Sequence, residues 1–212
     1  MKALIVLFII ILISIAIWMI GTVLAVRGIE KPKYSVRQQK NGYEIREYAK
    51  YIVAEVEVNG TQEKATRKWF SLLAWYIFWW NNSGRNISMT APVNDIKTSW
   101  EKIAMTAPVN DIKTWEETHT IQFILPSSST INTLPIPDND KVKLREKPAH
   151  KAAVLTYSGW ASETVVEAKK QELRELLEKD GIKIIGNMNS AQYNPPLSFP
   201  FLRRNEIIAE IE

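Results

Sequence analysis

The sequence predicts an α+β fold, a distorted antiparallel β-barrel with two long helices, preceded by an N-terminal transmembrane helix. Segments that alternate apolar and polar residues, the pattern of strands, outnumber segments with helical spacing. Each long helical segment follows a pair of strands, which is typical of α+β proteins and not of a wound βαβ sheet. A long uncharged segment precedes all of them. A curved antiparallel sheet with two helices on its outside satisfies this order.

Composition limits the function classes. The chain has 212 residues, of which 46% are hydrophobic, which suits one ordinary domain with a small addition. It has no cysteine and only two histidines, so a disulfide framework and a His/Cys zinc site are both excluded. The net charge of +4 comes from scattered basic residues, which gives no indication of nucleic-acid binding.

The N-terminal segment is uncharged from residue 3 to residue 26. About 20 apolar residues span a bilayer, whereas the apolar part of a signal peptide has about 7–15. We therefore expect residues 1–28 to form a transmembrane anchor, with an uncleaved signal sequence as the alternative. Basic residues are enriched over 27–40, which favours a cytoplasmic soluble domain. Three glycosylation-type triplets argue for the opposite side; they begin at Asn59, Asn81 and Asn86.

The soluble domain is expected to begin after a polar, proline-containing linker over residues 29–42. Residues 43–48 and 51–58 alternate and predict two strands. The two residues between them, Ala49-Lys50, are short enough for a hairpin turn. A helix is then expected from Thr61, a plausible N-cap, to about Trp80.

This first domain helix carries more apolar surface than one sheet needs. A single stripe at helical spacing would bury it; the stripe is Ala65, Trp69, Leu72, Leu73 and Tyr76. Further aromatic rings surround the rest of the helix. The excess implies a second burial partner, namely a ligand, a bilayer surface or another chain. The alternative is that the sheet curls round the helix and buries most of it.

A ten-residue block, MTAPVNDIKT, occurs at residues 89–98 and again at 105–114. Strands are expected over 86–93 and 102–109, each interrupted by a proline, which cannot donate to a sheet ladder. The Asn-Asp pair that follows each proline is typical of a turn. The spacing of the copies is much shorter than a repeat-protein unit, so we interpret the block as a local duplication.

The remaining elements follow from the same patterns. Strands are expected at 119–125, 141–146, 151–157 and 206–211, with a loop over 126–140 and a short strand at 182–185. A second helix is expected over 161–180, capped by Gly181. Its predicted buried stripe is Val165, Ala168, Leu173, Leu176 and Leu177.

Few residues stand out as candidates for chemistry. His119 shares the strand face of the apolar residues that follow it, so it could ligate iron, although a hydrogen-bonded position at the rim is the commoner role. Glu55 and Glu57 could act as acid–base groups, but alternation places them opposite the apolar face, where we expect solvent. The arginines at 203 and 204 could bind a ligand carboxylate through two parallel hydrogen bonds, or could form an ion pair with Glu206. No glycine-rich phosphate loop is present.

Four motifs resemble the SOUL/haem-binding protein family, also called the p22 haem-binding proteins. They are YEIREY at 43–48, MTAPV at 89–93, F-x-LP at 123–126, and YNPP…RRNE at 193–206. The resemblance covers about residues 34–212. It implies that residues 43–212 form one domain, a GyrI-like barrel with two helices. It also implies non-covalent binding of haem or another tetrapyrrole in a hydrophobic groove beside the first domain helix.

By this resemblance, the groove wall comes from that helix; the residues are Trp69, Phe70, Leu73, Tyr76, Ile77 and Trp80. Arg67 or Lys68 would pair with a propionate, and His119 is the candidate iron ligand. The sequence departs from the family's pattern in its Trp79-Trp80 pair and in its membrane anchor. The rings of that pair would either enlarge the groove or fill it.

The function predicted from the sequence is that of a membrane-anchored haem or porphyrin carrier or buffer without a catalytic step. One alternative is a GyrI-like small-molecule-binding barrel with hydrolase activity, which would use a buried glutamate as base. Another is a tryptophan-rich interaction module built on Trp75, Trp79 and Trp80. Nothing in the sequence indicates an oligomeric state.

Overall fold

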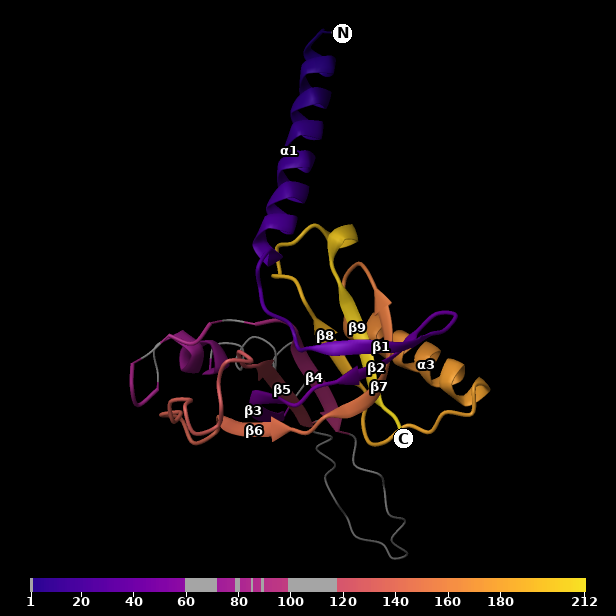
Figure 1. Ribbon diagram of the computed structural model, residues 1–212. Helices are drawn as coiled ribbons and strands as arrows, with labels where there is room; N and C mark the ends of the chain where they lie inside the picture. Colours follow the sequence, from indigo (N-terminus) through magenta and orange to yellow (C-terminus); the bar gives the residue numbers. More distant parts are fainter. Residues whose placement is uncertain (1, 60–71, 79–80, 85, 89, 99–117) are drawn as a thin grey trace, which may run out of the picture.

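The computed structural model describes residues 2–59, 72–78, 81–84, 86–88, 90–98 and 118–212 (Figure 1). The helices are α1 (Lys2–Val26), α3 (Glu163–Lys179) and the short 3-10 helix η1 (Pro200–Leu202), and residues 72–78 are also helical. The strands are β1 (Tyr34–Gln39), β2 (Glu44–Tyr48), β3 (Tyr51–Asn59), β4 (Val93–Thr98), β5 (Thr118–Ile124), β6 (Lys143–Lys147), β7 (His150–Tyr157), β8 (Asn189–Gln192) and β9 (Asn205–Glu210).

These strands form one curled antiparallel sheet in the order β1-β2-β7-β9-β8-β4-β5-β3-β6. All the pairings between neighbouring strands are antiparallel. The β8–β4 pairing joins two groups of strands into the single sheet. The predicted α+β architecture, a curved antiparallel sheet with helices outside it, is therefore confirmed.

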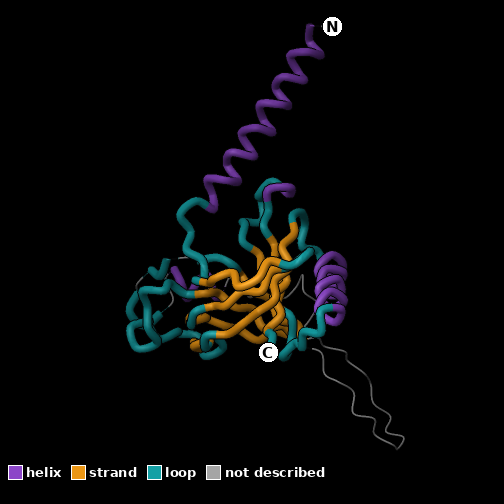
Figure 2. Tube along the Cα trace, turned by 45° about the vertical axis from the view of Figure 1, so that its right-hand side comes forward, coloured by secondary structure: helices purple, strands orange, loops and turns teal. Residues whose placement is uncertain are grey.

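The domain helices pack on the same face of this sheet. Helix α3 lies over β7 and β9, where Leu173 and Leu177 contact Leu155 and Ile207. The 72–78 helix packs its apolar side chains over β3 and β5. The opposite face is called the inner face here, and Figure 2 shows α3 on the outside of the sheet. Strand residues that point to the inner face include Arg46, Tyr48, Val154, Ala191 and Glu206.

Two expectations about the start of the domain are wrong. The linker expected over 29–42 contains the strand β1, whose polar sequence YSVRQQ gives little strand signal. The hairpin expected at Ala49-Lys50 does not form, because β2 pairs with β1 and β7 while β3 pairs with β5 and β6. The chain crosses at this point from one group of strands to the other.

The first copy of the ten-residue block also differs from expectation. The strand expected at 86–93 begins only at Val93, just after Pro92, and runs to Thr98. The Asn94-Asp95 pair is therefore inside β4, hydrogen-bonded between β5 and β8, and not in a turn. Strand β8 was not expected, because its sequence NSAQ lacks an apolar alternation. The second copy of the block lies outside the described residues.

Helix α3 agrees with the sequence except in one detail. Its buried face includes Val166 and Lys170, whereas Ala168, which was predicted to be buried, is exposed. The first half of the buried stripe is therefore rotated about the helix axis relative to the prediction. Gly181 has a φ of +67°, the left-handed conformation that favours glycine at a helix C-terminus. The last predicted strand is present as β9, and Ile207 and Ala209 are fully buried as expected.

Leu173→Ala tests the packing of α3 on the sheet. Leu173 is fully buried against β7 and β9, so truncation should lower the free energy of unfolding by about 2–5 kcal/mol. Urea titration of the full-length protein in detergent, followed by tryptophan fluorescence, would measure the loss. Ile136→Ala is the matched control, since Ile136 is 66% exposed and should change stability by less than about 0.5 kcal/mol. Equal effects of the two substitutions would contradict this packing.

Candidate functional site

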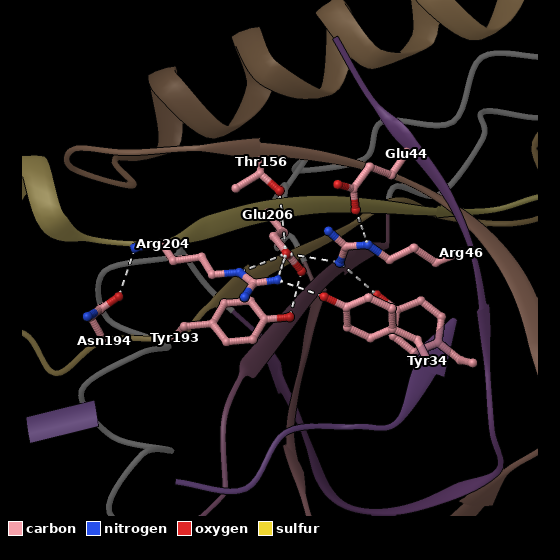
Figure 3. A network of polar contacts seen from close by, with 9 residues as sticks. Tyr34, Glu44, Arg46, Thr156, Tyr193, Asn194, Arg204 and Glu206 are labelled. Carbon is pink, nitrogen blue, oxygen red and sulfur yellow. Dashed lines mark hydrogen bonds and ion pairs between the residues drawn. The ribbon is translucent and has the colours of Figure 1, made fainter. Parts of the chain in front are cut away.

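The inner face holds a buried polar cluster around Glu206 of β9, whose side chain has no exposed surface. Arg46 donates to Glu206 Oε1 at 3.0 Å, and Arg204 donates to the same oxygen through Nη2 at 2.6 Å and Nε at 3.0 Å (Figure 3). Tyr193 donates its hydroxyl to Oε2 at 2.5 Å. Thr156 on β7 adds a longer contact of 3.4 Å to Oε1. The carboxylate is thus enclosed by donors, two of them cationic.

Strand geometry explains how these residues meet. Residues two apart share a strand face, so Arg204 and Glu206 project to the same side at the start of β9. Arg46 reaches them from β2, across the intervening strand β7. The residues of β7 that flank this path on the inner face are the small or branched Ala152 and Val154. They leave room for the long arginine side chain, which is only 2% exposed.

Three tyrosines complete the cluster. The guanidinium of Arg46 lies 4.4 Å from the ring centroid of Tyr34, and that of Arg204 lies 4.5 Å from the centroid of Tyr193. Arg46 also donates to the hydroxyl of Tyr48 at 3.3 Å, and Arg204 donates to that of Tyr34 at 3.2 Å. Each arginine therefore has a carboxylate, a hydroxyl and an aromatic face, which together offset the cost of burying its charge.

The segment between α1 and β1, residues 29–33, crosses the open side of the inner face and is called the N-terminal strap here. The amide of Ala91 donates to Glu30 O at 2.9 Å, and the amide of Ala49 donates to Lys33 O at 3.0 Å. Ile29 packs with the apolar residues of the inner face. A cavity of about 100 Å³ remains beside the strap, lined by Val26, Ile29, Lys31, Ala91, Tyr193, Asn194, Leu202 and Arg204. The strap therefore lies beside Tyr193 and Arg204, at one side of the cluster.

A second buried carboxylate lies at the other end of the inner face. Glu55 on β3 accepts from Arg145 Nε at 2.7 Å and from Gln122 Nε2 at 2.9 Å. The sequence placed Glu55 on the correct face but in solvent, and it is only 5% exposed. The neighbouring strands β5 and β6 supply its cover, which alternation within β3 does not reveal. Glu57 is exposed, as expected.

The predicted groove residues divide into two sets. Leu73, Tyr76 and Ile77 are at most 2% exposed and form part of the core, and the Tyr76 hydroxyl donates to Pro135 O at 2.9 Å. Trp75, on the other side of the same helix, is 43% exposed. The remaining candidates lie outside the described residues, and their role stays a prediction; they are Trp69, Phe70, Trp80, Arg67 and Lys68.

His119 lies on the apolar face, as its position in the alternation predicted, and is only 1% exposed. Its Nδ1 is 2.9 Å from Oδ1 of Asp95 on the adjacent strand β4. An enclosed ring would have to be uncovered before it could ligate a haem iron. The other histidine, His150, stacks on Tyr48 with a centroid distance of 5.3 Å. The proposed ligation by His119 remains untested.

The described residues do not by themselves make a slot that fits haem. A flat macrocycle needs an apolar cleft with cations at its rim. The described part of the 72–78 helix already uses its buried apolar side chains in the core, and tyrosines and arginines fill the inner face. Any groove beside this helix would therefore need Trp75 together with residues that the structure does not describe.

Sequence reasoning anticipated one contact of the cluster, the pairing of Arg204 with Glu206. It did not anticipate Arg46, Tyr48 or Tyr34. The available signal was the alternation of β2, since Arg46 lies on the face opposite Ile45. The burial of a charged strand residue such as Arg46 can be predicted only when its ion-pair partner is known. That partner, Glu206, is 160 residues away in the sequence.

A family model described as "SOUL heme-binding protein" matches residues 29–210 of the chain. The fold is also similar to solved structures at low identity. An uncharacterized conserved protein from Listeria innocua aligns with a TM-score of 0.56 at 14% identity, covering 82% of this chain and 93% of that one. The EcmrR C-terminal domain aligns with a TM-score of 0.54 at 10% identity, covering 84% of this chain and 98% of that one.

A hydrolase from Listeria innocua aligns with a TM-score of 0.53 at 13% identity, covering 83% of this chain and 94% of that one. At such identities the likeness concerns the fold alone. A search of curated proteins finds no match to this chain.

Glu206→Gln tests whether the cluster depends on this charge. The substitution removes the carboxylate charge beside the partly exposed Arg204 and the buried Arg46, and leaves Arg46 with Glu44 as its charged partner, 2.7 Å from its Nε. The free energy of unfolding should therefore fall by about 3 kcal/mol, the lower end of the range for a broken buried ion pair. Glu47→Gln is the control, because it breaks a pair with Arg37 that is exposed on both sides and worth less than about 1 kcal/mol. Urea unfolding of both variants would compare them, and a Glu206→Gln loss no larger than that of Glu47→Gln would contradict the assignment.

The tyrosines give a pH dependence. Burial, and then the charge of Glu206, raise the pKa of Tyr48 to about 12, above the value near 10 of an unfolded tyrosine. Between these pH values the folded chain keeps a proton that the unfolded chain has lost, so stability falls as the pH rises through this window. Unfolding measured from pH 9 to 12 should show a shallower decline in Tyr48→Phe. An unchanged slope would contradict the burial of this hydroxyl.

Proposed function

Because the chain belongs to the SOUL haem-binding protein family, we propose that it binds haem or a related tetrapyrrole non-covalently, as a membrane-anchored carrier or buffer without a catalytic step. The observation that carries this proposal is the family match, which extends over residues 29–210 and therefore over every described strand of the sheet. Apolar contact would supply most of the affinity, with no covalent attachment, since the chain has no cysteine.

The first domain helix is the proposed binding side. Trp75 exposes 43% of its surface on the helix that buries Leu73 and Tyr76 on its other side. An exposed indole offers a flat apolar face of the kind on which a macrocycle stacks. The predicted groove residues outside the described part of the chain, with Arg67 or Lys68 toward a propionate, would complete the site. His119 is too enclosed in this arrangement to be central to the proposal.

The membrane anchor rests on α1. The helix has 25 residues and is long and apolar enough to cross a bilayer, although a signal sequence near an N-terminus passes the same test. Figure 1 shows it extending away from the sheet. The basic residues that follow it favour the cytoplasmic side for the domain. One membrane-buried contact per chain would keep such a carrier close to the bilayer.

The rival proposal is a small-molecule hydrolase that uses a buried carboxylate as general base. A base needs an oxygen that can accept a proton from a bound nucleophile. Glu206 is occupied by two guanidiniums and a tyrosine hydroxyl, and Glu55 by Arg145 and Gln122. These contacts favour structural roles for both carboxylates, and therefore binding over hydrolysis. A visible absorption spectrum of the purified protein with and without added hemin separates the two proposals.

Hemin titration of the full-length protein in detergent tests the binding proposal. We expect a shift of the Soret band and quenching of tryptophan fluorescence that saturates at one hemin per chain. Trp75→Ala should weaken binding about 3–10-fold, the equivalent of one aromatic contact. Trp160→Ala is the matched control, since Trp160 is also exposed, at 59%, but its ring packs on Arg203, next to η1.

Absence of a Soret shift at micromolar hemin would contradict the proposed function. Binding that is equally weakened by Trp75→Ala and Trp160→Ala would leave haem binding in place but contradict its location beside the helix.

A further inference from the structure

The loop before β9, residues 195–202, packs beside the last turns of α1 (Figure 1). The indole of Trp18 donates to Leu197 O at 2.8 Å, and the amide of Phe199 donates to the Thr22 hydroxyl at 2.7 Å. The rings of Trp18 and Phe199 meet edge to face at 5.0 Å. Thr22 is 4% exposed as a result. The loop is thus fixed to the helix at Trp18 and Thr22, and not at its end.

If α1 spans a bilayer, these contacts place the loop at the depth of the hydrocarbon core. A helix rises about 1.5 Å per residue, so Trp18 lies about 12 Å before the end of α1 at Val26. A hydrocarbon core about 30 Å thick takes up about 20 residues. Counted from Lys2, which must stay at the far surface, that core extends to about Thr22. Leu197, held at the level of Trp18, then lies inside the boundary of the hydrocarbon.

The side chains at this depth suit lipid. Leu197 is 86% exposed and Phe201 is 78% exposed, and both are far more exposed than the aliphatic residues of the core. Leu202 adds a further exposed apolar side chain of the same loop. Clustered exposed apolar residues on a soluble surface are unusual and mark an interaction site. Because they continue the apolar surface of α1, the same bilayer is the partner they fit.

Most backbone polar groups of the loop are paired within the chain. Each carbonyl from Pro195 to Pro200 accepts a hydrogen bond within the chain, including those from Trp18, Gly159 and Arg203. Residues 195, 196 and 200 are prolines, which have no amide proton to satisfy. Irregular backbone is tolerated at membrane depth when its polar groups are paired, a requirement that these carbonyls meet; the amides of Leu197 and Phe201 make no such hydrogen bond. An ordinary surface loop would leave many of them to water.

Polar and amphipathic residues adjoin the loop. Arg203 donates to Ser198 O at 3.0 Å and to Pro196 O, and its guanidinium lies 4.0 Å from the ring centroid of Trp160. Trp160 is 59% exposed. Tryptophan and arginine are typical residues of the interface between lipid and water.

We propose that the loop 195–202 inserts beside α1 into the bilayer as a second membrane contact, with Leu197 and Phe201 in the hydrocarbon and Trp160 and Arg203 at the interface. The proposal rests on the membrane anchoring proposed above. Two contacts fix the orientation of the domain on the membrane, which a single flexible tether would not do.

Fluorophore depth measurements on the full-length protein in lipid nanodiscs test this inference. The chain has no cysteine, so the single substitutions Leu197→Cys and Phe201→Cys can each be labelled with the polarity-sensitive dye NBD. Leu12→Cys, in the middle of α1, reports the anchor itself. Ile136→Cys is the matched soluble control, since Ile136 is a similarly exposed aliphatic residue, at 66%.

We expect blue-shifted NBD emission, and quenching by lipids with doxyl groups on their acyl chains, at residues 12, 197 and 201 but not at 136. Quenching at residue 12 alone would overturn the loop insertion and leave the anchor in place. Absence of quenching at residue 12 would overturn the anchor and, with it, this inference. Quenching at residue 136 as well would also overturn it, because the whole domain would then lie on the lipid.

Discussion

The charge of Glu206 is the constraint on which the inner face depends. A carboxylate with no exposed surface is stable only when donors replace the water it has lost. Arg46 and Arg204 supply those donors together with Tyr193, and Arg46, whose side chain is 2% exposed, in turn needs carboxylate partners for its buried charge. Removing Arg46 or Glu206 would leave the charge of the other buried with fewer partners. The arrangement of the inner face is therefore stabilised by these ion pairs as well as by apolar packing.

This cluster also links the two ends of the domain. Arg204 precedes β9 near the C-terminus, and its guanidinium donates to the hydroxyl of Tyr34, the first residue of β1. The N-terminal strap that leads into Tyr34 is the direct continuation of α1. A few residues before Arg204, the loop 195–202 contacts α1 at Trp18 and Thr22. The segment that precedes β9 thus contacts both α1 and the start of β1.

Local pattern in the sequence was enough to predict much of this architecture. Alternation placed His119 on the apolar face and Ile207 in the core, and helical spacing found α3, because each signal lies within one element. Strands β1 and β8 were missed because polar residues fill them: β1 stays mostly exposed, and β8 is buried by its neighbours. Glu55 was expected in solvent for the same reason, since Arg145 and Gln122 come from other strands. The cluster of Glu206 depends on contacts between residues far apart in sequence, which no local pattern contains.

The interaction between Arg46 and Glu206 is therefore central to this structure, and a double-mutant cycle measures their coupling energy most directly. The two single variants, Arg46→Met and Glu206→Gln, and their combination would be compared by urea unfolding of the full-length protein. The account predicts that the double variant loses less stability than the sum of the single losses, with a coupling energy near the upper end of the range of about 0.5–3 kcal/mol seen for residues in contact. Additive losses, with a coupling energy near zero, would contradict it.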